Sequence, residues 1–483
     1  MTFTSPPFIV FLTAFAFGYY IVSARWRVIL LAGVSVLFYL LWSIPYTLLL
    51  LTLTALVYGA GIQLENVSEE RKKTRILQWS VIMLLLILCF FKYGRALQEY
   101  TPYIPFQFPY NISFLFPLGV SYYTFKLISY LIDVYAGRST AERSILAFTA
   151  YVTFFPQILA GPIQRATHFL PQITVAHTPT IYLIRSGVRL ILFGLFKKLV
   201  VADSLSVLVS PLYDNPSQYS GLALLITSYL FTIQLYADFS ALTDIAIGSA
   251  RLFGIHSPKN FENPLYARTI QEFWQKWHIT LTTWMRDYVF LPLRMTFRHR
   301  GTVGLALSIF INMVLIGVWH GASLTFLWFG IIHGAVMVFS ATTLHAREKI
   351  FGNFSIVRAL RMIWQPITTF TFVSLSLIFF RIDTKEHAIE MLSRIFSSSI
   401  LTTHIEHVFT SIAAPHDTKR LLFLAFAILL MELFHITQGN QRLRAIAVSL
   451  PAPIRLTAYY ILLLMIFMST GKQEAEPFIY FQF

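Results

Sequence analysis

Long apolar runs limit what this chain can fold into more than any other feature of its sequence. They come in blocks of about sixteen to more than twenty residues, the length that a helix needs to cross a hydrocarbon core of roughly 30 Å. Strands that cross a membrane would be shorter and would alternate in polarity. We therefore predict twelve or thirteen apolar helices, not all of which need to cross. They lie at 1–22, 28–42, 46–62, 76–92, 113–135, 146–160, 182–202, 219–250, 303–319, 322–341, 359–380, 421–437 and 455–469.

The composition agrees with this prediction. Of the 483 residues, 56% are hydrophobic and 12% are charged, whereas a soluble domain has about 25% charged residues. We expect an all-α polytopic membrane protein that forms a single integral membrane domain over residues 1–483. The single cysteine, Cys89, excludes an intramolecular disulfide and is expected to face lipid or to pack in the core.

Basic residues outnumber acidic residues by 37 to 22, which gives a formal net charge of +15. They fall in short loops and amphipathic segments, where they contact the head groups of membrane lipids and set the topology. No basic patch is interleaved with stacking aromatic residues, so nucleic acid is not expected as a partner.

The short loops predict an orientation. The loops "SARWR" and "ENVSEERKKTR" are two spans apart and therefore lie on the same side of the membrane. By the positive-inside rule that side is cytoplasmic, which places the N-terminus outside. The first run lacks a basic start and a small-residue cleavage pattern, so we expect a first span rather than a removed signal peptide. The weakly hydrophobic region 382–420 is expected at a surface.

Two of the apolar runs are interrupted. One contains Pro117 and Gly119, and the other contains Pro156, Gly161 and Pro162. Irregular backbone at membrane depth must be covered by protein or line a wet cavity. We therefore expect a cavity or a re-entrant loop.

One segment has the pattern of an amphipathic helix rather than of a span. In "NPLYARTIQEFWQKWHITLTTWMRDYVFLPL", Thr269 and Glu272 have the spacing of a capping box at its start. The helix is expected to lie in the membrane interface or to bury its apolar stripe against other helices. The stripe consists of Phe273, Trp277, Leu281, Trp284 and Tyr288.

Ionisable groups at bilayer depth cost roughly 2.5–3.5 kcal/mol each on insertion scales, so they are candidates for function. Each also has a structural interpretation. Lys197 and Lys198 are expected to snorkel to an interface. Lys126 lies two helical turns from Asp133, and Asp244 has the same spacing to Arg251, so packing or an ion pair is the alternative there. The candidates are Asp238, Asp244, Lys126, Asp133, Lys197, Lys198, His320 and His333.

His320 has the surroundings of a general base. It follows Trp319 and precedes Gly321, and a glycine lets another backbone or a substrate approach the ring. A neutral imidazole can take a proton from a hydroxyl group. His333 follows thirteen residues later, about 220° around a continuous helix. The two rings can share one site only if the chain breaks near Gly321.

The sequence has no motif of a metal site or of a soluble nucleophile. HExxH, the P-loop, the dinucleotide glycine fingerprint and GxSxG are absent. We expect no bound metal and no bound cofactor.

Five blocks, in order, resemble the signatures of the membrane-bound O-acyltransferase (MBOAT) family. Within that family they are most similar to the bacterial alginate O-acetyltransferases. The likeness runs from about residue 113 to residue 340 and is specific because the blocks keep their order. The blocks are "FPLGVSYYTFKLISYLIDVYAG", "QILAGPIQRATHFLPQI", "QLYADFSALTDIAIGSARLFGI", "NFENPLYARTIQEFWQKWHITLTTWMRDYVFLPL" and "GVWHGASLTFLWFGIIHG".

This resemblance implies a bundle of transmembrane, re-entrant and interfacial helices around a central tunnel. It implies that His320 is catalytic, acting as base toward a hydroxyl that attacks an acyl thioester, with acetyl-CoA as the cytoplasmic donor. His333 belongs to the same block and is also predicted to be catalytic. The resemblance further implies a set of residues that line or support the tunnel: Trp319, Asp238, Asp244, Arg268, Glu272, Trp274, His278, Arg286 and Asp287.

In this branch the acceptor is a polysaccharide outside the cell, reached through a separate periplasmic or extracellular acetyltransferase. The implied location is the bacterial cytoplasmic (inner) membrane. Peptidoglycan O-acetylation and D-alanyl transfer to teichoic acid are alternatives within the family. A solute transporter is the alternative from another class.

Overall fold

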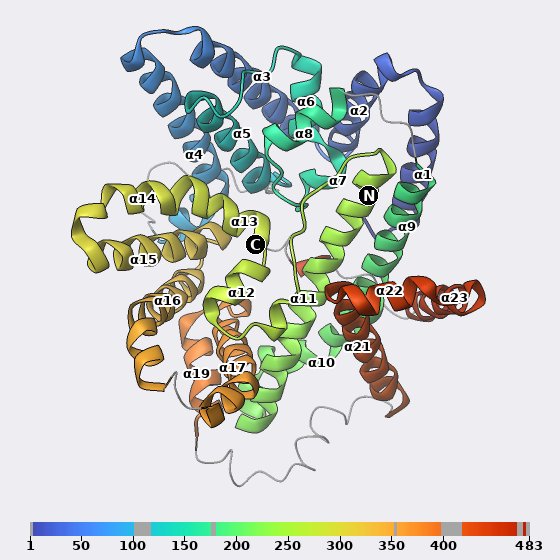
Figure 1. The fold of residues 1–483 in the computed structure, drawn as a ribbon, viewed down its shortest axis with the longest axis vertical. Coiled ribbons are helices and arrows are strands. Elements are labelled where there is room, and N and C mark those ends of the chain that lie inside the picture. The colour runs from blue at the N-terminus through green and yellow to red at the C-terminus, as the bar shows by residue number, and fades with distance from the viewer. Residues whose placement is uncertain are drawn as a thin grey trace. The chain divides into compact units, whose positions relative to one another are not determined.

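The computed structural model describes residues 3–100, 117–174, 180–351, 355–397, 418–470 and 477–479. Every regular element in these residues is a helix (Figure 1), which confirms the predicted all-α class. The chain divides into two compact units. The first comprises Met1–Gly194 and Leu242–Lys259, and the second comprises Leu195–Ala241 and Asn260–Phe483.

Eight helices in the described part of the chain are long and apolar enough to cross a membrane. The protein is therefore a multi-pass membrane protein, with fewer long spans than apolar runs. The runs at 1–22, 28–42, 113–135, 146–160 and 182–202 contribute none of the eight, because the helices there are shorter or broken. The eight segments are Ile44–Asn66, Glu70–Gly94, Gly221–Leu252, Arg298–His320, Leu324–Thr343, Arg361–Arg381, Thr418–Gly439 and Ala452–Ser469.

The first unit is packed around α5 (Val120–Tyr135), which is buried over nearly its whole length. It lies against α3 (Ile44–Asn66), α4 (Glu70–Tyr100) and α6 (Ile145–Thr153), as Figure 1 shows. A helix buried on all sides needs no polar face, and its apolar residues pack in every direction. The unit also contains α1 (Pro6–Ile21), α2 (Ala24–Leu40), α7 (Phe155–Ile158), α8 (Ala166–Thr174), most of α9 (Ile181–Phe196) and the last part of α11 (Gly221–Leu252).

Both predicted interruptions are confirmed in this unit. Gly119 has a left-handed backbone, with φ 73°, immediately before α5 begins. At the other site, α6 ends at Thr153 and α7 begins at Phe155, with Pro156 in its first turn. Proline is accepted at that position because the first turn of a helix leaves its N–H groups unpaired anyway.

The buried charges of α5 have partners other than the one that their spacing suggested. Lys126 donates to the carbonyl oxygen of Tyr151, and its ammonium lies 4.4 Å from the centre of that ring. Asp133 pairs with Arg138, with 3.2 Å between nitrogen and oxygen.

The second unit holds residues 317–334, "GVWHGASLTFLWFGIIHG", which we call the WHG block. Its core elements are α15 (Gly301–His320) and α16 (Leu324–Phe351), which run side by side in Figure 1, with α12 (Ile270–Lys276) against α16. The remaining elements are the π-helical turn η1 (Lys197–Ala202), α10 (Asp203–Asp214), η2 (Pro216–Gln218), the first part of α11, η3 (Pro264–Tyr266), α13 (Ile279–Met285), the π-helical turn η4 (Arg286–Phe290), α14 (Leu291–Thr296), η5 (Arg298–Arg300), α17 (Ser355–Ser376), α18 (Ile378–Arg381), α19 (Lys385–Ile395), α21 (Thr418–Gly439), α22 (Gln441–Ser449) and α23 (Ala452–Ser469).

The single amphipathic helix predicted after Asn263 is wrong. The segment breaks between α12 and α13, where His278 adopts a left-handed backbone with φ 44° and ψ 52°. That conformation costs a residue other than glycine about 1–2 kcal/mol. The predicted start is confirmed, because Thr269 Oγ1 accepts the N–H of Glu272 at 3.1 Å. The predicted stripe is buried from Phe273 to Trp284.

Two further predictions concern Cys89 and the region 382–420. Cys89 is exposed on α4, a spanning helix, as the lipid-facing interpretation requires. The surface region 382–420 is described only in part: it contains α19, and residues 398–417 lie outside the described residues.

Replacing Gly119 by alanine should destabilise the first unit strongly. The added Cβ would lie 1.8 Å from the carbonyl oxygen of Ile158, and the left-handed backbone is strained for any L side chain. We expect a cost of about 1–2 kcal/mol from the backbone and about 1–3 kcal/mol more from overpacking. Thermal melting of the detergent-solubilised protein, followed by size-exclusion chromatography, measures the loss.

Gly137→Ala is the matched control. Gly137 also has a positive φ, 68°, but a Cβ there would meet no atom within 4 Å. Equal melting shifts for the two variants would contradict the importance of the close contact.

Candidate active site

The chain breaks between the two histidines of the WHG block. The helix α15 ends at His320, Gly321 is extended with φ −171° and ψ 171°, and α16 begins at Leu324. The condition under which the two rings can share one site is therefore met. A side chain at Gly321 would collide with the ring of Phe326, 2.2 Å from an ideal Cβ.

Glycines bring α15 and α16 into backbone contact. A Cβ on Gly317 would lie 2.8 Å from the Cα of Gly330 and 2.4 Å from the carbonyl oxygen of Phe326. A Cβ on Gly330 would lie 2.8 Å from the carbonyl oxygen of Met313. Small residues at a crossing allow this approach between helices in membranes. The crossing sets how the end of α15 faces the first turns of α16.

Aromatic rings surround His320. Its ring centre lies 4.9 Å from those of Trp319 and Phe380, and 6.3 Å from that of Phe329. The side chain retains 5% of its exposure. Since Phe380 belongs to α18, three helices supply this environment.

His333 lies on the other side of Phe329, with 4.3 Å between their ring centres. Trp274 Nε1 donates to its Nδ1 at 3.2 Å. Its Nε2 lies 2.8 Å from Ser376 Oγ, whose own proton is directed to the carbonyl of Val373 at 2.7 Å. Nε2 must therefore carry the proton and donate it. Both nitrogens of this fully buried ring are in hydrogen bonds.

His278 is the third histidine near this site, after His320 and His333. Its ring centre lies 6.1 Å from that of Trp319 and 4.8 Å from that of Phe239. Burial lowers the pKa of His278 to about 3, because loss of water disfavours the imidazolium. His278 is thus a neutral ring in contact with the residue that precedes His320.

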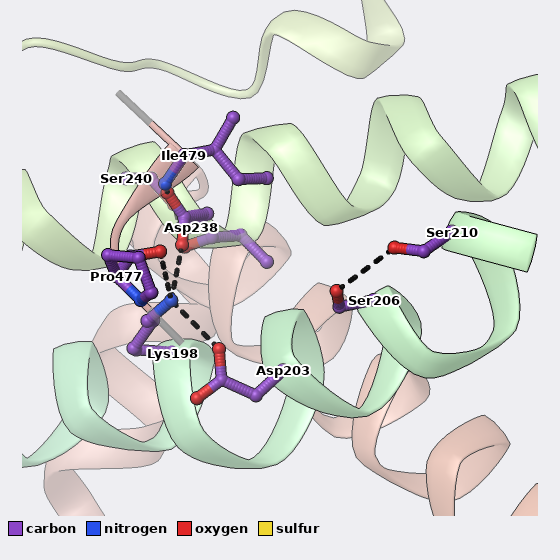
Figure 2. A network of polar contacts seen from close by, with 9 residues as sticks. Lys198, Asp203, Ser206, Ser210, Asp238, Ser240, Pro477 and Ile479 are labelled. Carbon is purple, nitrogen blue, oxygen red and sulfur yellow. Dashed lines mark hydrogen bonds and ion pairs between the residues drawn. The ribbon is translucent and has the colours of Figure 1, made fainter. Parts of the chain in front are cut away.

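Asp238 belongs to a separate buried ion cluster, drawn in Figure 2. Lys198 Nζ lies 2.9 Å from Asp238 Oδ1 and 2.8 Å from Asp203 Oδ1. The other oxygen of Asp238 accepts the backbone N–H of Ile479 at 2.9 Å. The carbonyl of Pro477 also faces the lysine, at 3.4 Å. The cluster therefore fastens residues 477–479 to η1 and α11.

The predicted snorkelling of Lys197 and Lys198 is wrong. Both residues are 1% exposed. Lys197 Nζ donates to Ser240 Oγ at 2.8 Å, and Lys198 has the two carboxylates described above. Hydrogen-bonding partners within the protein hold these cations, so they do not need to reach an interface.

Four other residues were predicted to support the site. Arg268 precedes α12, Glu272 lies in its first turn, and Arg286 and Asp287 lie in η4. Glu272 accepts the backbone N–H of Arg268 at 2.8 Å and the ammonium of Lys276 at 2.6 Å. Arg286 and Asp287 pair with each other at 2.8 Å in η4.

Asp244 lies in the first unit, half-buried on α11. Arg251, at ion-pair spacing from it, donates to Ser186 Oγ. In the part of the chain that the structure describes, no group of three or more His, Cys, Asp or Glu side chains could hold a metal ion.

Several residues of this site carried no signal in the sequence. Ser376 and Phe380 come from helices outside the resembling blocks, and they meet the histidines only through tertiary packing. Phe329 and Asn260 lie inside the blocks but were not singled out, because a phenylalanine in an apolar run and an asparagine in a loop are unremarkable alone.

The structure is that of an all-α membrane protein with two buried histidines near the junction of two helices long enough to span a membrane. The sequence model of the membrane-bound O-acyltransferase family matches residues 31–380. The chain belongs to this family and is an O-acyltransferase. That result removes the transporter alternative.

Similar proteins carry the names of enzymes that transfer acyl groups. A probable alginate O-acetylase of Pseudomonas aeruginosa is 33% identical over 82% of this chain and 75% of its own length. A peptidoglycan O-acetyltransferase of Helicobacter pylori is 28% identical over 81% and 79%, respectively. A teichoic acid D-alanyltransferase of Streptococcus thermophilus is 30% identical over 48% and 59%.

Replacing Lys198 by methionine should destabilise the second unit. Two carboxylates would remain in a buried site without their cation, which costs about 3–5 kcal/mol when one partner of a buried pair is removed. Adding Asp238→Asn should recover part of the loss, because it removes one of the stranded charges. Melting temperatures of the single and double variants test this.

Lys385→Met is the control. Lys385 pairs with Glu386 at 3.6 Å while its side chain is 54% exposed, and surface pairs are worth about 0–1 kcal/mol. Equal melting temperatures for the Lys198 and Lys385 variants would show that the cluster does not carry stability.

Proposed function

We propose that this protein transfers an acetyl group from cytoplasmic acetyl-CoA toward hydroxyl groups of a polysaccharide outside the membrane. A separate periplasmic or extracellular acetyltransferase completes the transfer. The proposed location is the bacterial inner membrane, with the N-terminus outside. The likeness to probable alginate O-acetylases over 82% of the chain supports the acetyl group and the polysaccharide. The tunnel through which the group passes stays a prediction.

In the proposed reaction, His320 takes the proton of an acceptor hydroxyl as its oxygen attacks the thioester carbonyl. The new carbon–oxygen bond forms and the carbon–sulfur bond breaks. The proton then passes from His320 to the leaving thiolate, so the imidazole is restored. General-base catalysis of this kind contributes roughly 10²–10⁴-fold to a rate.

The position of His320 at the end of α15 is the observation that carries this proposal. The C-terminal end of a helix carries a partial negative charge, which stabilises a cation there by about 0.3–1 kcal/mol. This effect favours the imidazolium that forms when the ring accepts a proton.

We assign a positioning role to His333. Its Nδ1 lone pair accepts the indole N–H of Trp274, and its Nε2 proton is given to Ser376. To act as a base, the ring would first have to lose one of these bonds in a buried site, where an unmade bond is costly. The ring instead holds α12, α16 and α17 together behind Phe329.

Peptidoglycan O-acetylation is the second candidate function. The H. pylori relative matches 81% of this chain, which is nearly the coverage of the alginate O-acetylase. The same histidine chemistry would serve a peptidoglycan acceptor. Supplying purified polymers of both kinds, with the partner acetyltransferase, decides between them by which polymer becomes acetylated.

His320→Ala should abolish acetyl transfer while leaving the protein folded. We expect a fall of at least about 100-fold, the lower end of general-base contributions. Membrane vesicles that contain the variant and radiolabelled acetyl-CoA give the transfer rate, and chromatography of the solubilised protein reports folding. His299→Ala, at an exposed position in η5, serves as the control. Full transfer by folded His320→Ala protein would refute the proposal.

Glutamine separates the roles of the two histidines. A glutamine side chain can donate one hydrogen bond and accept another, but it cannot take a proton. His333→Gln should therefore keep most of the activity, because the bonds to Trp274 and Ser376 can be replaced. His320→Gln should be as inactive as His320→Ala. The reverse order of activities would make His333 the base.

A further inference from the structure

Asn260 contacts three consecutive residues, 278–280, at the break between α12 and α13. Its carbonyl oxygen accepts the N–H of Ile279 at 2.9 Å. Its side-chain Oδ1 accepts the N–H of Thr280 at 3.1 Å and the hydroxyl of Thr280 at 2.8 Å. The same oxygen lies 3.1 Å from His278 Nδ1.

These contacts determine which atom of the Asn260 amide faces Thr280 and which ring nitrogen of His278 carries the proton. A backbone N–H can only donate, so the atom of Asn260 that faces Thr280 must be the amide oxygen and not its nitrogen. That oxygen can only accept, so His278 Nδ1 must carry a proton and donate it. His278 is therefore held as the Nδ1–H tautomer, and Nε2 carries the lone pair.

We infer that Asn260 is a positioning residue for acyl transfer, which fixes the tautomer and the direction of His278 beside Trp319 and His320. The inference rests on the proposed function, because it gives His278 a place in the same site. In this arrangement His278 Nε2 carries the lone pair and can accept a hydrogen bond, whereas His333 presents its proton on Nε2. His278 and His333 are thus held in opposite tautomers.

The backbone supports this inference independently. Among the described residues, Asn263 and His278 are the residues other than glycine with a positive φ. Strained conformations of this kind persist only where surrounding contacts over-determine them, and they concentrate at functional sites. The bonds from Asn260 to residues 278–280 supply that constraint.

An asparagine at position 260, rather than an aspartate, also agrees with a neutral His278. Asn260 is 1% exposed, and its Nδ2 has no hydrogen-bond partner among the described residues. An aspartate would accept the same three donors without leaving a buried N–H₂ group unpaired. It would, however, place a negative charge against the imidazole and favour its charged form. Asparagine keeps His278 neutral.

The tautomer can be measured directly. Proton–nitrogen correlation spectra of the full-length protein, labelled in its histidines and held in lipid nanodiscs, show which ring nitrogen carries a proton. The chain has 13 histidines, so the signal of His278 is assigned by its loss in His278→Gln. We expect a proton on Nδ1 and none on Nε2. A proton on Nε2 instead would overturn the inference.

Substitutions at position 260 test the positioning role. Asn260→Leu should shift the proton toward Nε2 and lower kcat by roughly 10–100-fold, the range seen for partners that orient metal-binding histidines. Asn260→Asp keeps an acceptor oxygen and should keep the Nδ1 proton. Thr54→Val removes a buried hydroxyl of α3 in the first unit, and should leave both the tautomer and kcat as in the parent protein.

The two proposals fail in distinguishable ways. An active His320→Ala variant would refute the proposed function, while the histidine spectra would still report the tautomer. If His320→Ala is inactive but Asn260→Leu keeps the parent's tautomer and kcat, the inference about Asn260 fails alone. Should Asn260→Leu not fold, the spectra of the parent protein still decide the tautomer.

Discussion

The crossing of α15 and α16 at Gly317 and Gly330 is the contact on which the candidate site depends. With no side chains between them, the two backbones meet, and a Cβ on Gly317 would be 2.8 Å from the opposite Cα. The short connection through Gly321 then lets the chain reverse without a long loop. His320 lies at the end of one helix, and His333 lies about two and a half turns into the next. Phe329 fills the space between them.

Other helices complete this arrangement rather than create it. α17 contributes the hydroxyl that fixes His333, α18 contributes the ring of Phe380, and α12 contributes the indole of Trp274. Each comes from a distant part of the sequence: Ser376 is 43 residues from His333, and Trp274 is 59 residues away. Tertiary packing within the second unit therefore determines the hydrogen bonds and ring contacts of each histidine, although the WHG block determines its position in the chain.

The sequence was sufficient for the helical class, for the interruptions at Gly119 and Pro156, and for the histidines as candidates. Apolar length and the special backbone of glycine and proline are local properties, so they can be read without a structure. The break at Gly321 was foreseen only as a condition for one shared site. The break at His278 was missed because the apolar stripe continues through it in register, and nothing local marks a left-handed histidine.

Buried charges show most clearly why the rest could not be predicted. Snorkelling was the reasonable expectation for Lys197 and Lys198, because it requires no knowledge of partners. Their actual partners lie at least 40 residues away, apart from Asp203, and Lys198 also faces Pro477, 279 residues along the chain. A buried ion pair is favourable only when its geometry satisfies both charges. That geometry exists only in the folded chain.

His278, His320 and His333 illustrate a consequence of burial for the proposed catalysis. In a medium of low polarity, an imidazole becomes charged only where other groups stabilise the cation. His278 and His333 are fully buried, and each has a tautomer fixed by oxygen acceptors and an N–H donor. His320 is 5% exposed and lies at the negative end of a helix. The proposed function places the developing charge on His320, while His278 and His333 stay neutral and hold their positions.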